Sequence, residues 1–177
     1  MRCGDALVVV LACAVVGCSS QSSSEVRAAE VYDTAIRWLA TERADDPEPL
    51  RMFVEPRGEG ASIELDVQAE VIQLSADLAD VRFIDARDEA LVETDSTVAP
   101  PDPDQAKPDA AMLTVRDGGM LVRLGPVIED GARLNLEIDR WDSDEQFTTL
   151  EFVLRDRGGQ WQVVGSPVVT GSLDLDE

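Results

Sequence analysis

Histidine is absent from this chain of 177 residues, and its three cysteines all lie within the first 18 positions. Lysine occurs once, at Lys107, so almost every basic side chain is an arginine. Beyond residue 18 the chain therefore has no Ser-His-Asp triad, no cysteine nucleophile, and no thiolate or imidazole ligand for zinc. We expect no metal site and no cofactor, and no disulfide in the domain that follows.

Positive charge is scarce as well, since 15 lysines and arginines face 36 aspartates and glutamates, for a formal net charge of −21. Binding of nucleic acid needs a basic face that displaces counterions from phosphates. Direct adsorption on anionic lipid headgroups needs the same kind of surface. We therefore expect no nucleic-acid partner, and contact with a membrane only through an anchor.

The apolar run at the N-terminus, Ala6 to Val16, is far shorter than the roughly 20 residues that span a bilayer as a helix. Its length is typical of the apolar core of a signal peptide, and it leads directly into Val15-Val16-Gly17-Cys18. That tetrapeptide resembles the lipobox of bacterial lipoprotein signal peptides. The alternatives are an ordinary secretory peptide with a chance cysteine, or cleavage at Cys13, which follows a shorter apolar run.

The lipobox resemblance implies that Cys18 carries a diacylglyceryl group and becomes the mature N-terminus. Two acyl chains suffice for stable anchoring, at about 0.8 kcal/mol per buried methylene. The predicted location is the cell membrane, with the domain outside the cytoplasm. We predict a signal peptide over 1–17, a serine-rich tether over 18–24, one domain over 25–173 and an acidic tail over 174–177.

The first half of the domain alternates between helical and extended patterns. Its apolar spacing predicts a helix from Glu25 to Arg43 with Ser24 as N-cap, and Asp45-Asp46-Pro47 should end it. The segment from Ser62 to Leu78 fits both a strand and a helix, and its composition favours a helix capped by Ser62. The helical face expected in the first segment consists of Ala29, Tyr32, Ile36, Leu39 and Ala40; strands are expected at 50–55 and 81–85.

The second half is extended. The proline- and aspartate-rich stretch over 93–109 is predicted to be a surface loop, either a tolerated insertion or a partner-binding loop. Strands 112–115 and 120–124 are expected to form a hairpin around Asp117-Gly118-Gly119. Further strands at 133–141, with Leu134, Leu136 and Ile138 on one face, and at 146–155 and 160–169 should continue it as an antiparallel meander. The predicted class is α+β, with one or two N-terminal helices on a curved antiparallel sheet.

Three segments carry a family resemblance: Phe83 to Glu89, Leu124-Gly125-Pro126, and Leu154 to Gly165 with its Gly-Gln-Trp-Gln-Val core. Together, over roughly 31–171, the chain resembles a group of secreted or lipid-anchored bacterial proteins. The layout is similar to cystatin-like or NTF2-like domains, in which a helix lies across a curved antiparallel sheet. The resemblance implies a fold and a location, and it carries no activity across.

A tentative cleft is predicted where the strand at 81–85 ends. Asp85, Arg87 and Asp88 follow that strand, and a carboxylate beside an arginine can act as a general base. The alternative is a solvated turn with weak local ion pairs. Asp142, Asp144 and Glu145 offer oxygen ligands for calcium, but their spacing lacks the glycine and distal glutamate of an EF-hand loop, so a solvated hairpin tip is the favoured interpretation.

The three tryptophans complete the candidate residues. Trp38 and Trp161 are predicted to lie in the core, whereas Trp141, beside a polar turn, fits either a buried or an exposed position. The preferred hypothesis is a non-enzymatic, lipid-anchored binding or accessory module, with an apolar pocket between helix and sheet and an unknown protein or a small apolar ligand as partner. The alternative is an NTF2-like enzyme that works with carboxylates and arginine alone.

Overall fold

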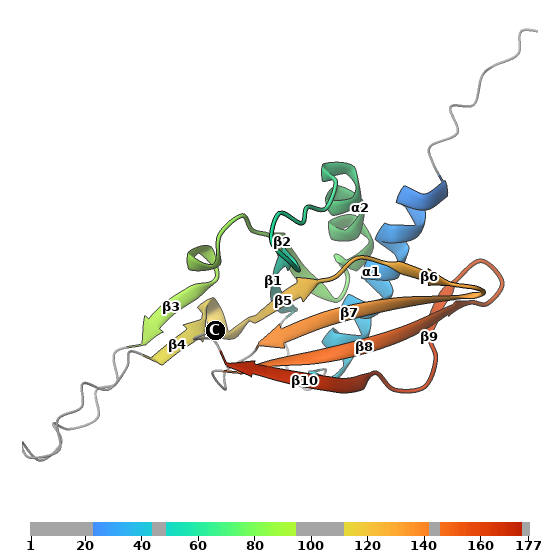
Figure 1. Cartoon of the computed structure of the whole chain (residues 1–177). Coiled ribbons are helices and arrows are strands. Elements are labelled where there is room, and N and C mark those ends of the chain that lie inside the picture. The colour runs from blue at the N-terminus through green and yellow to red at the C-terminus, as the bar shows by residue number, and fades with distance from the viewer. Residues whose placement is uncertain (1–22, 44–48, 95–111, 142–145, 175–177) are drawn as a thin grey trace, which may run out of the picture.

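The computed structural model describes residues 23–43, 49–94, 112–141 and 146–174 (Figure 1). Two N-terminal helices pack on one face of a curled mixed sheet, which confirms the predicted α+β class. No helix among the described residues is both long and apolar enough to cross a membrane. The elements are α1 (Ser23–Thr41), β1 (Leu50–Pro56), α2 (Leu65–Ser75), β2 (Ala79–Phe83), the 3₁₀ helix η1 (Arg87–Glu89), β3 (Leu91–Thr94), β4 (Met112–Val115), the 3₁₀ helix η2 (Arg116–Gly118), β5 (Met120–Leu124), β6 (Ile128–Asp130), β7 (Arg133–Trp141), β8 (Gln146–Asp156), β9 (Trp161–Val163) and β10 (Val168–Asp174).

The main sheet is mixed, so the predicted antiparallel meander is wrong. Its strand order is β10-β8-β7-β5-β1-β2, with β6 paired to β7 and β9 paired to β8. β1 runs parallel to both of its neighbours, β2 and β5, whereas β5, β7, β8 and β10 pair antiparallel. The β1–α2–β2 segment is thus a crossover unit, which parallel neighbours require.

Strands β1 and β5 lie in the middle of the sheet because they are apolar on both faces. Met52, Phe53 and Val54 of β1 are all buried, as are Met120, Leu121 and Val122 of β5. Such unbroken apolar runs are typical of strands that are covered on both sides and have parallel neighbours. Strand β7, which lies between β5 and β8, alternates instead, with Leu134, Leu136 and Ile138 buried on the helix side as predicted.

Helix α1 covers one face of the sheet, behind the strands in Figure 1, and its predicted apolar face is confirmed. Ala29, Tyr32, Ile36, Leu39 and Ala40 are all at most 8% exposed. The Tyr32 hydroxyl donates a hydrogen bond to the Gly125 carbonyl oxygen at 3.1 Å. A Cβ at Gly125 would lie 2.7 Å from the carbonyl oxygen of Glu137, so only glycine allows this close approach of β5 to β7.

The opposite face of the sheet has its own apolar cluster under the two-stranded β3–β4 ribbon. Phe53, Leu121 and Trp141 from the sheet meet residues of the ribbon and of the segment before it. Trp141 is fully buried there, which decides between the two positions left open for it. Trp38 and Trp161, predicted to be core residues, are only half-buried and pack against the rim of the main core.

The expected β4–β5 hairpin does not form. A turn is present, with Asp117 at φ 57° and Gly118 at φ 65°, but β4 pairs with β3 and β5 pairs with β1 and β7. Gly119 sits where a Cβ would lie 2.7 Å from the carbonyl oxygen of Arg51. The glycines therefore redirect the chain from the ribbon into close contact with β1, rather than folding two strands together.

Several predicted boundaries also shift. Helix α1 begins at Ser23, so the last two tether residues, including the expected cap Ser24, lie inside it. The segment at 62–78 is a helix as favoured, but α2 begins at Leu65 with Glu64 rather than Ser62 at its N-cap. The strand expected at 160–169 is two strands, β9 and β10, separated by a bend at Gly165 (φ 76°), and β10 runs on into the predicted acidic tail to Asp174.

Candidate functional site

The structure does not gather the predicted cleft residues into one cleft. Asp85 and Asp88 are exposed and line different hollows, Asp85 beside α2 and Asp88 beside Arg116. The carboxylate of Glu89 accepts hydrogen bonds from the backbone N–H groups of Asp85 (3.1 Å) and Ala86 (3.2 Å). These two hydrogen bonds to Glu89 therefore stabilise the turn at η1.

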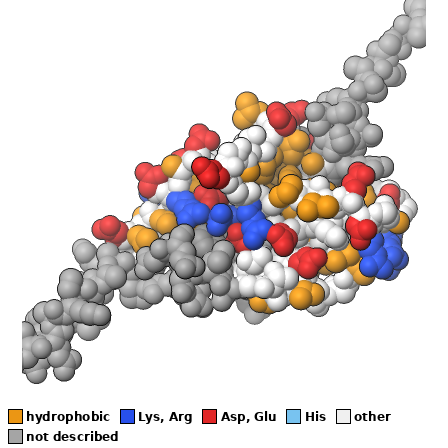
Figure 2. All heavy atoms as spheres, viewed as in Figure 1, with side chains coloured by type: hydrophobic (Ala, Val, Ile, Leu, Met, Phe, Trp, Pro, Cys, Tyr) orange, Lys and Arg blue, Asp and Glu red, His pale blue; other side chains and the backbone are white. Residues whose placement is uncertain are grey.

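Arg87 joins a charged network on the sheet face that α1 leaves uncovered. Its Nε lies 2.9 Å from Glu55 Oε1, and the Nε of Arg123 lies 3.3 Å from the same oxygen. Arg123 reaches on to Asp139, with Nη1 to Oδ2 at 3.5 Å. Strand register produces this row, because Glu55 pairs with Arg123 and Arg123 pairs with Asp139. Figure 2 shows basic and acidic side chains interleaved across the middle of this face.

Asp139 is the most deeply buried member of the network, with its side chain 1% exposed. Its Oδ2 accepts a hydrogen bond from Arg57 Nε at 2.9 Å, and its Oδ1 accepts one from the Thr149 hydroxyl at 2.8 Å. Arg57 also pairs with Glu137. The buried carboxylate of Asp139 and the partly buried one of Glu55 are thus both paired with arginines, an arrangement suited to joining strands rather than to moving protons.

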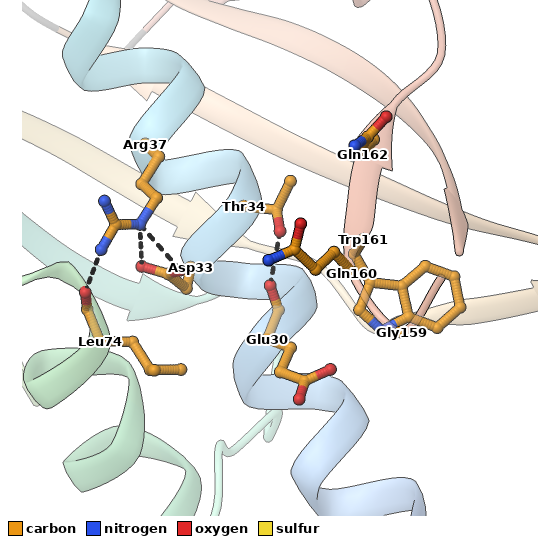
Figure 3. Close-up of a pocket in the computed structure, with 9 residues that line it drawn as sticks. All are labelled: Glu30, Asp33, Thr34, Arg37, Leu74, Gly159, Gln160, Trp161 and Gln162. Atoms are coloured by element: carbon orange, nitrogen blue, oxygen red, sulfur yellow. Dashed lines mark hydrogen bonds and ion pairs between the residues drawn. The ribbon is translucent and has the colours of Figure 1, made fainter. Parts of the chain in front are cut away.

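A separate, open hollow of about 460 Å³ lies at the rim between α1, the end of α2 and the β8–β9 hairpin (Figure 3). The space directly between α1 and the sheet, where an apolar pocket is expected, is instead filled by fully buried side chains such as Ile36, Leu39 and Phe152. The rim hollow is mostly polar and has the volume of a small-molecule site. Its lining residues are Glu30, Asp33, Thr34, Arg37, Leu74, Gly159, Gln160, Trp161 and Gln162.

On the α2 side of the hollow, Arg37 forms ion pairs and hydrogen bonds that link α1 to the end of α2. Its Nε lies 2.9 Å from Asp33 Oδ2, its Nη2 lies 2.6 Å from Asp77 Oδ1, and Nη2 also donates to the Leu74 carbonyl oxygen. The buried hydroxyl of Ser75 donates to Asp33 Oδ1 at 2.7 Å. The hydrogen bond with Asp77 raises the pKa of Arg37, and the same bond lowers the pKa of Asp77. Arg37 and Asp77 therefore stay charged near neutral pH, and the contacts of Arg37 with Leu74 and of Asp33 with Ser75 tie α1 to the end of α2.

The hairpin side of the hollow is different, because no described side chain compensates its negative charge. Figure 3 shows Arg37 and Asp33 turned toward α2, whereas the Glu30 carboxylate and the Trp161 indole lie on the side of the hairpin. Among the described residues the Glu30 carboxylate has no hydrogen-bond or ion-pair partner. The half-buried indole forms an aromatic wall, and Gln160 and Gln162 add amide groups that can donate or accept.

Sequence reasoning did not select Glu30, Asp33, Arg37 or Gln160 for this site. Asp33 and Arg37 are four residues apart in the predicted helix, which is the spacing of an ion pair. That spacing cannot show that a hairpin more than a hundred residues later closes over the same turn of helix. Trp161 was selected, but as a core residue rather than as the wall of a hollow.

The remaining candidate residues fall elsewhere. Cys18, Asp142, Asp144 and Glu145 lie outside the described residues, as does the predicted loop except for Glu93 and Thr94, which belong to β3. Within the part of the chain that the structure describes, no three acidic, histidine or cysteine side chains come together as a metal site. Comparison with protein-family models, with curated proteins and with solved structures finds no match for this chain.

Proposed function

We propose that this protein is a lipid-anchored, extracytoplasmic binding module that holds a small ligand in the hollow between α1 and the β8–β9 hairpin. The observation that carries the proposal is a carboxylate without a partner among the described residues, Glu30, beside an aromatic wall, Trp161, around a hollow of about 460 Å³. Concave sites with an aromatic surface and a few fixed polar groups are the usual form of small-ligand sites.

The charged network favours binding over the alternative of a carboxylate- and arginine-dependent enzyme. Such an enzyme needs an acid or base with room for a substrate beside it. Asp139 and Glu55 are occupied by arginines, and Asp85 and Asp88 line separate hollows. In the ligand hollow, Asp33 is likewise held by Arg37 and Ser75, which leaves Glu30 to meet a ligand.

The cystatin-like or NTF2-like assignment is kept as part of the same proposal. A long helix across a curled sheet supports it, whereas the parallel pairing of β1 with β2 and β5 departs from the antiparallel sheet of those domains. Fold alone does not determine ligand or activity, so the assignment adds nothing to the choice of ligand.

The anchor is tested at Cys18. The mature wild-type protein should partition into detergent and begin with a cysteine that carries diacylglycerol, because two acyl chains give stable membrane binding. Cys18→Ala should remain unprocessed or appear without lipid. Mass spectrometry of the N-terminal peptide measures this, with Cys13→Ala as the matched control that should be processed normally. A wild-type N-terminus at another residue, without lipid, would contradict the anchor.

Ligand binding in the hollow is tested with the mature protein labelled with 5-fluorotryptophan. A library of small cationic, neutral and anionic compounds should contain members that shift the ¹⁹F resonance of Trp161 and leave that of the fully buried Trp141 unchanged. Trp161→Phe and Trp141→Phe assign the two resonances. If no compound of any charge moves the Trp161 signal selectively, the hollow is not a ligand site and the proposed function is wrong.

A further inference from the structure

The hollow carries more negative than positive charge. Arg37 is its one basic lining residue among those described, and it is shared between Asp33, which also lines the hollow, and Asp77 just behind it. Glu30 adds a third carboxylate, with no partner among the described groups. A ligand in the hollow therefore meets an excess of negative charge. The net charge of the whole chain is −21, so the local charge of the hollow and the overall charge of the protein both attract cations.

The aromatic wall of the hollow, Trp161, limits the chemical class of the ligand further. Tryptophan has the aromatic face that binds cations most strongly, and a desolvated organic cation gains more from it than a hydrated metal ion does. The hollow also has no gathered set of three acidic ligands for a metal among the described residues. Its volume of about 460 Å³ accommodates an organic molecule rather than a single ion.

We infer that the hollow binds a small organic cation, an ammonium or quaternary ammonium group, with its charge between the Glu30 carboxylate and the face of Trp161. The amides of Gln160 and Gln162 lie where they can contact the polar remainder of such a ligand. The inference rests on the proposed function and specifies the charge and chemical class of the ligand.

Choline and 3,3-dimethylbutan-1-ol are the decisive probes, because the two have the same shape and only choline carries a positive charge. Titration of each into the full mature protein, in a non-ionic maltoside detergent at low salt, is followed by the ¹⁹F signal of Trp161. Choline should bind about tenfold more tightly than its neutral analogue, and added salt should weaken choline binding alone.

Two variants test the residues. Glu30→Gln keeps the shape of the side chain and should weaken choline binding about threefold to tenfold, with little effect on the neutral analogue. Trp161→Leu keeps apolar bulk without the aromatic face and should weaken choline binding by a similar factor. Calorimetry measures binding to this variant, because the fluorine probe at position 161 is lost. Glu59→Gln, which removes one exposed carboxylate away from the hollow, is the control and should bind like the wild type.

The outcomes distinguish a failure of the organic-cation site from a failure of the proposed ligand-binding function. Equal binding of the two probes, unchanged binding in Glu30→Gln, or failure of choline to bind would overturn the organic-cation site. If neutral or anionic library compounds still shift Trp161 selectively in that case, the ligand-binding function stands and only its ligand class is wrong. Thermal unfolding of each variant verifies that a loss of binding comes from a folded protein.

Discussion

Replacing Asp139 with alanine should lower the free energy of unfolding by about 3–5 kcal/mol, which is the usual cost of removing one partner from a buried ion pair. The side chain of Asp139 is 1% exposed, and its loss leaves the guanidinium groups of Arg57 and Arg123 without their shared carboxylate. It also removes the acceptor of the buried Thr149 hydroxyl. Arg57 and Arg123 are 26% and 19% exposed, so partial hydration places the expected value toward the lower end.

The matched control is Glu137→Gln, which removes a carboxylate from the same Arg57. The Glu137 side chain is 49% exposed, so its loss should cost less than about 1 kcal/mol. Urea unfolding followed by circular dichroism measures both values. The double replacement Arg123→Met with Asp139→Leu should recover much of the lost stability, because well-packed apolar side chains can substitute for a buried ion pair. Equal costs for Asp139→Ala and Glu137→Gln would show that burial of the network does not matter.

Trp141→Ala should be about as damaging, with a loss of about 3–5 kcal/mol for a fully buried large aromatic side chain. Trp141 fills the space between the sheet and the β3–β4 ribbon together with Phe53 and Leu121, so its removal leaves a cavity on that face. Trp161→Ala should cost roughly half as much, because Trp161 is half-buried at the rim of the main core.

The decisive quantity is therefore the difference in free energy of unfolding between Trp141→Ala and Trp161→Ala. Urea unfolding of both variants, with Trp38→Ala as a second rim position, gives the ranking directly. Trp38 is half-buried and packs edge-on against Phe152 with ring centroids 5.4 Å apart. If Trp161→Ala proves more destabilising than Trp141→Ala, the second apolar cluster contributes less to stability than its burial indicates.

Helices and strand positions could be predicted from the sequence where a single face is buried. The apolar spacing in α1 reports one buried side and is confirmed residue by residue. The alternation in β7 correctly predicts the buried face of Leu134, Leu136 and Ile138, but Asp139 and Trp141 on the opposite face are buried as well. Sheet topology could not be predicted from local turn signals. Asp117-Gly118-Gly119 does turn the chain, but a turn does not specify which strands pair after it.

A usable signal for the topology was nevertheless present. Met52-Phe53-Val54 and Met120-Leu121-Val122 are unbroken apolar runs, and a strand at the surface of a meander would alternate. Both runs mark strands covered on two faces, and these are the strands that pair in parallel. The hollow offered no comparable signal, because Glu30 and Trp161 meet only through the long-range packing of α1 against the hairpin.

The position of β1 inside the sheet limits the order in which the strands can pair during folding. The crossover through α2 brings β2 to one side of β1 early, but its other neighbour, β5, comes only after the ribbon segment has been made. From β5 onward each main strand adds to a growing free edge, through β7 and β8 to β10. Helix α1, the first of the described elements, rests on side chains such as Phe152 that arrive near the end. A chain that emerges N-terminus first thus exposes the apolar face of α1 until nearly all of it is out. We expect slow folding, and a requirement for protection against aggregation until the last strands have formed.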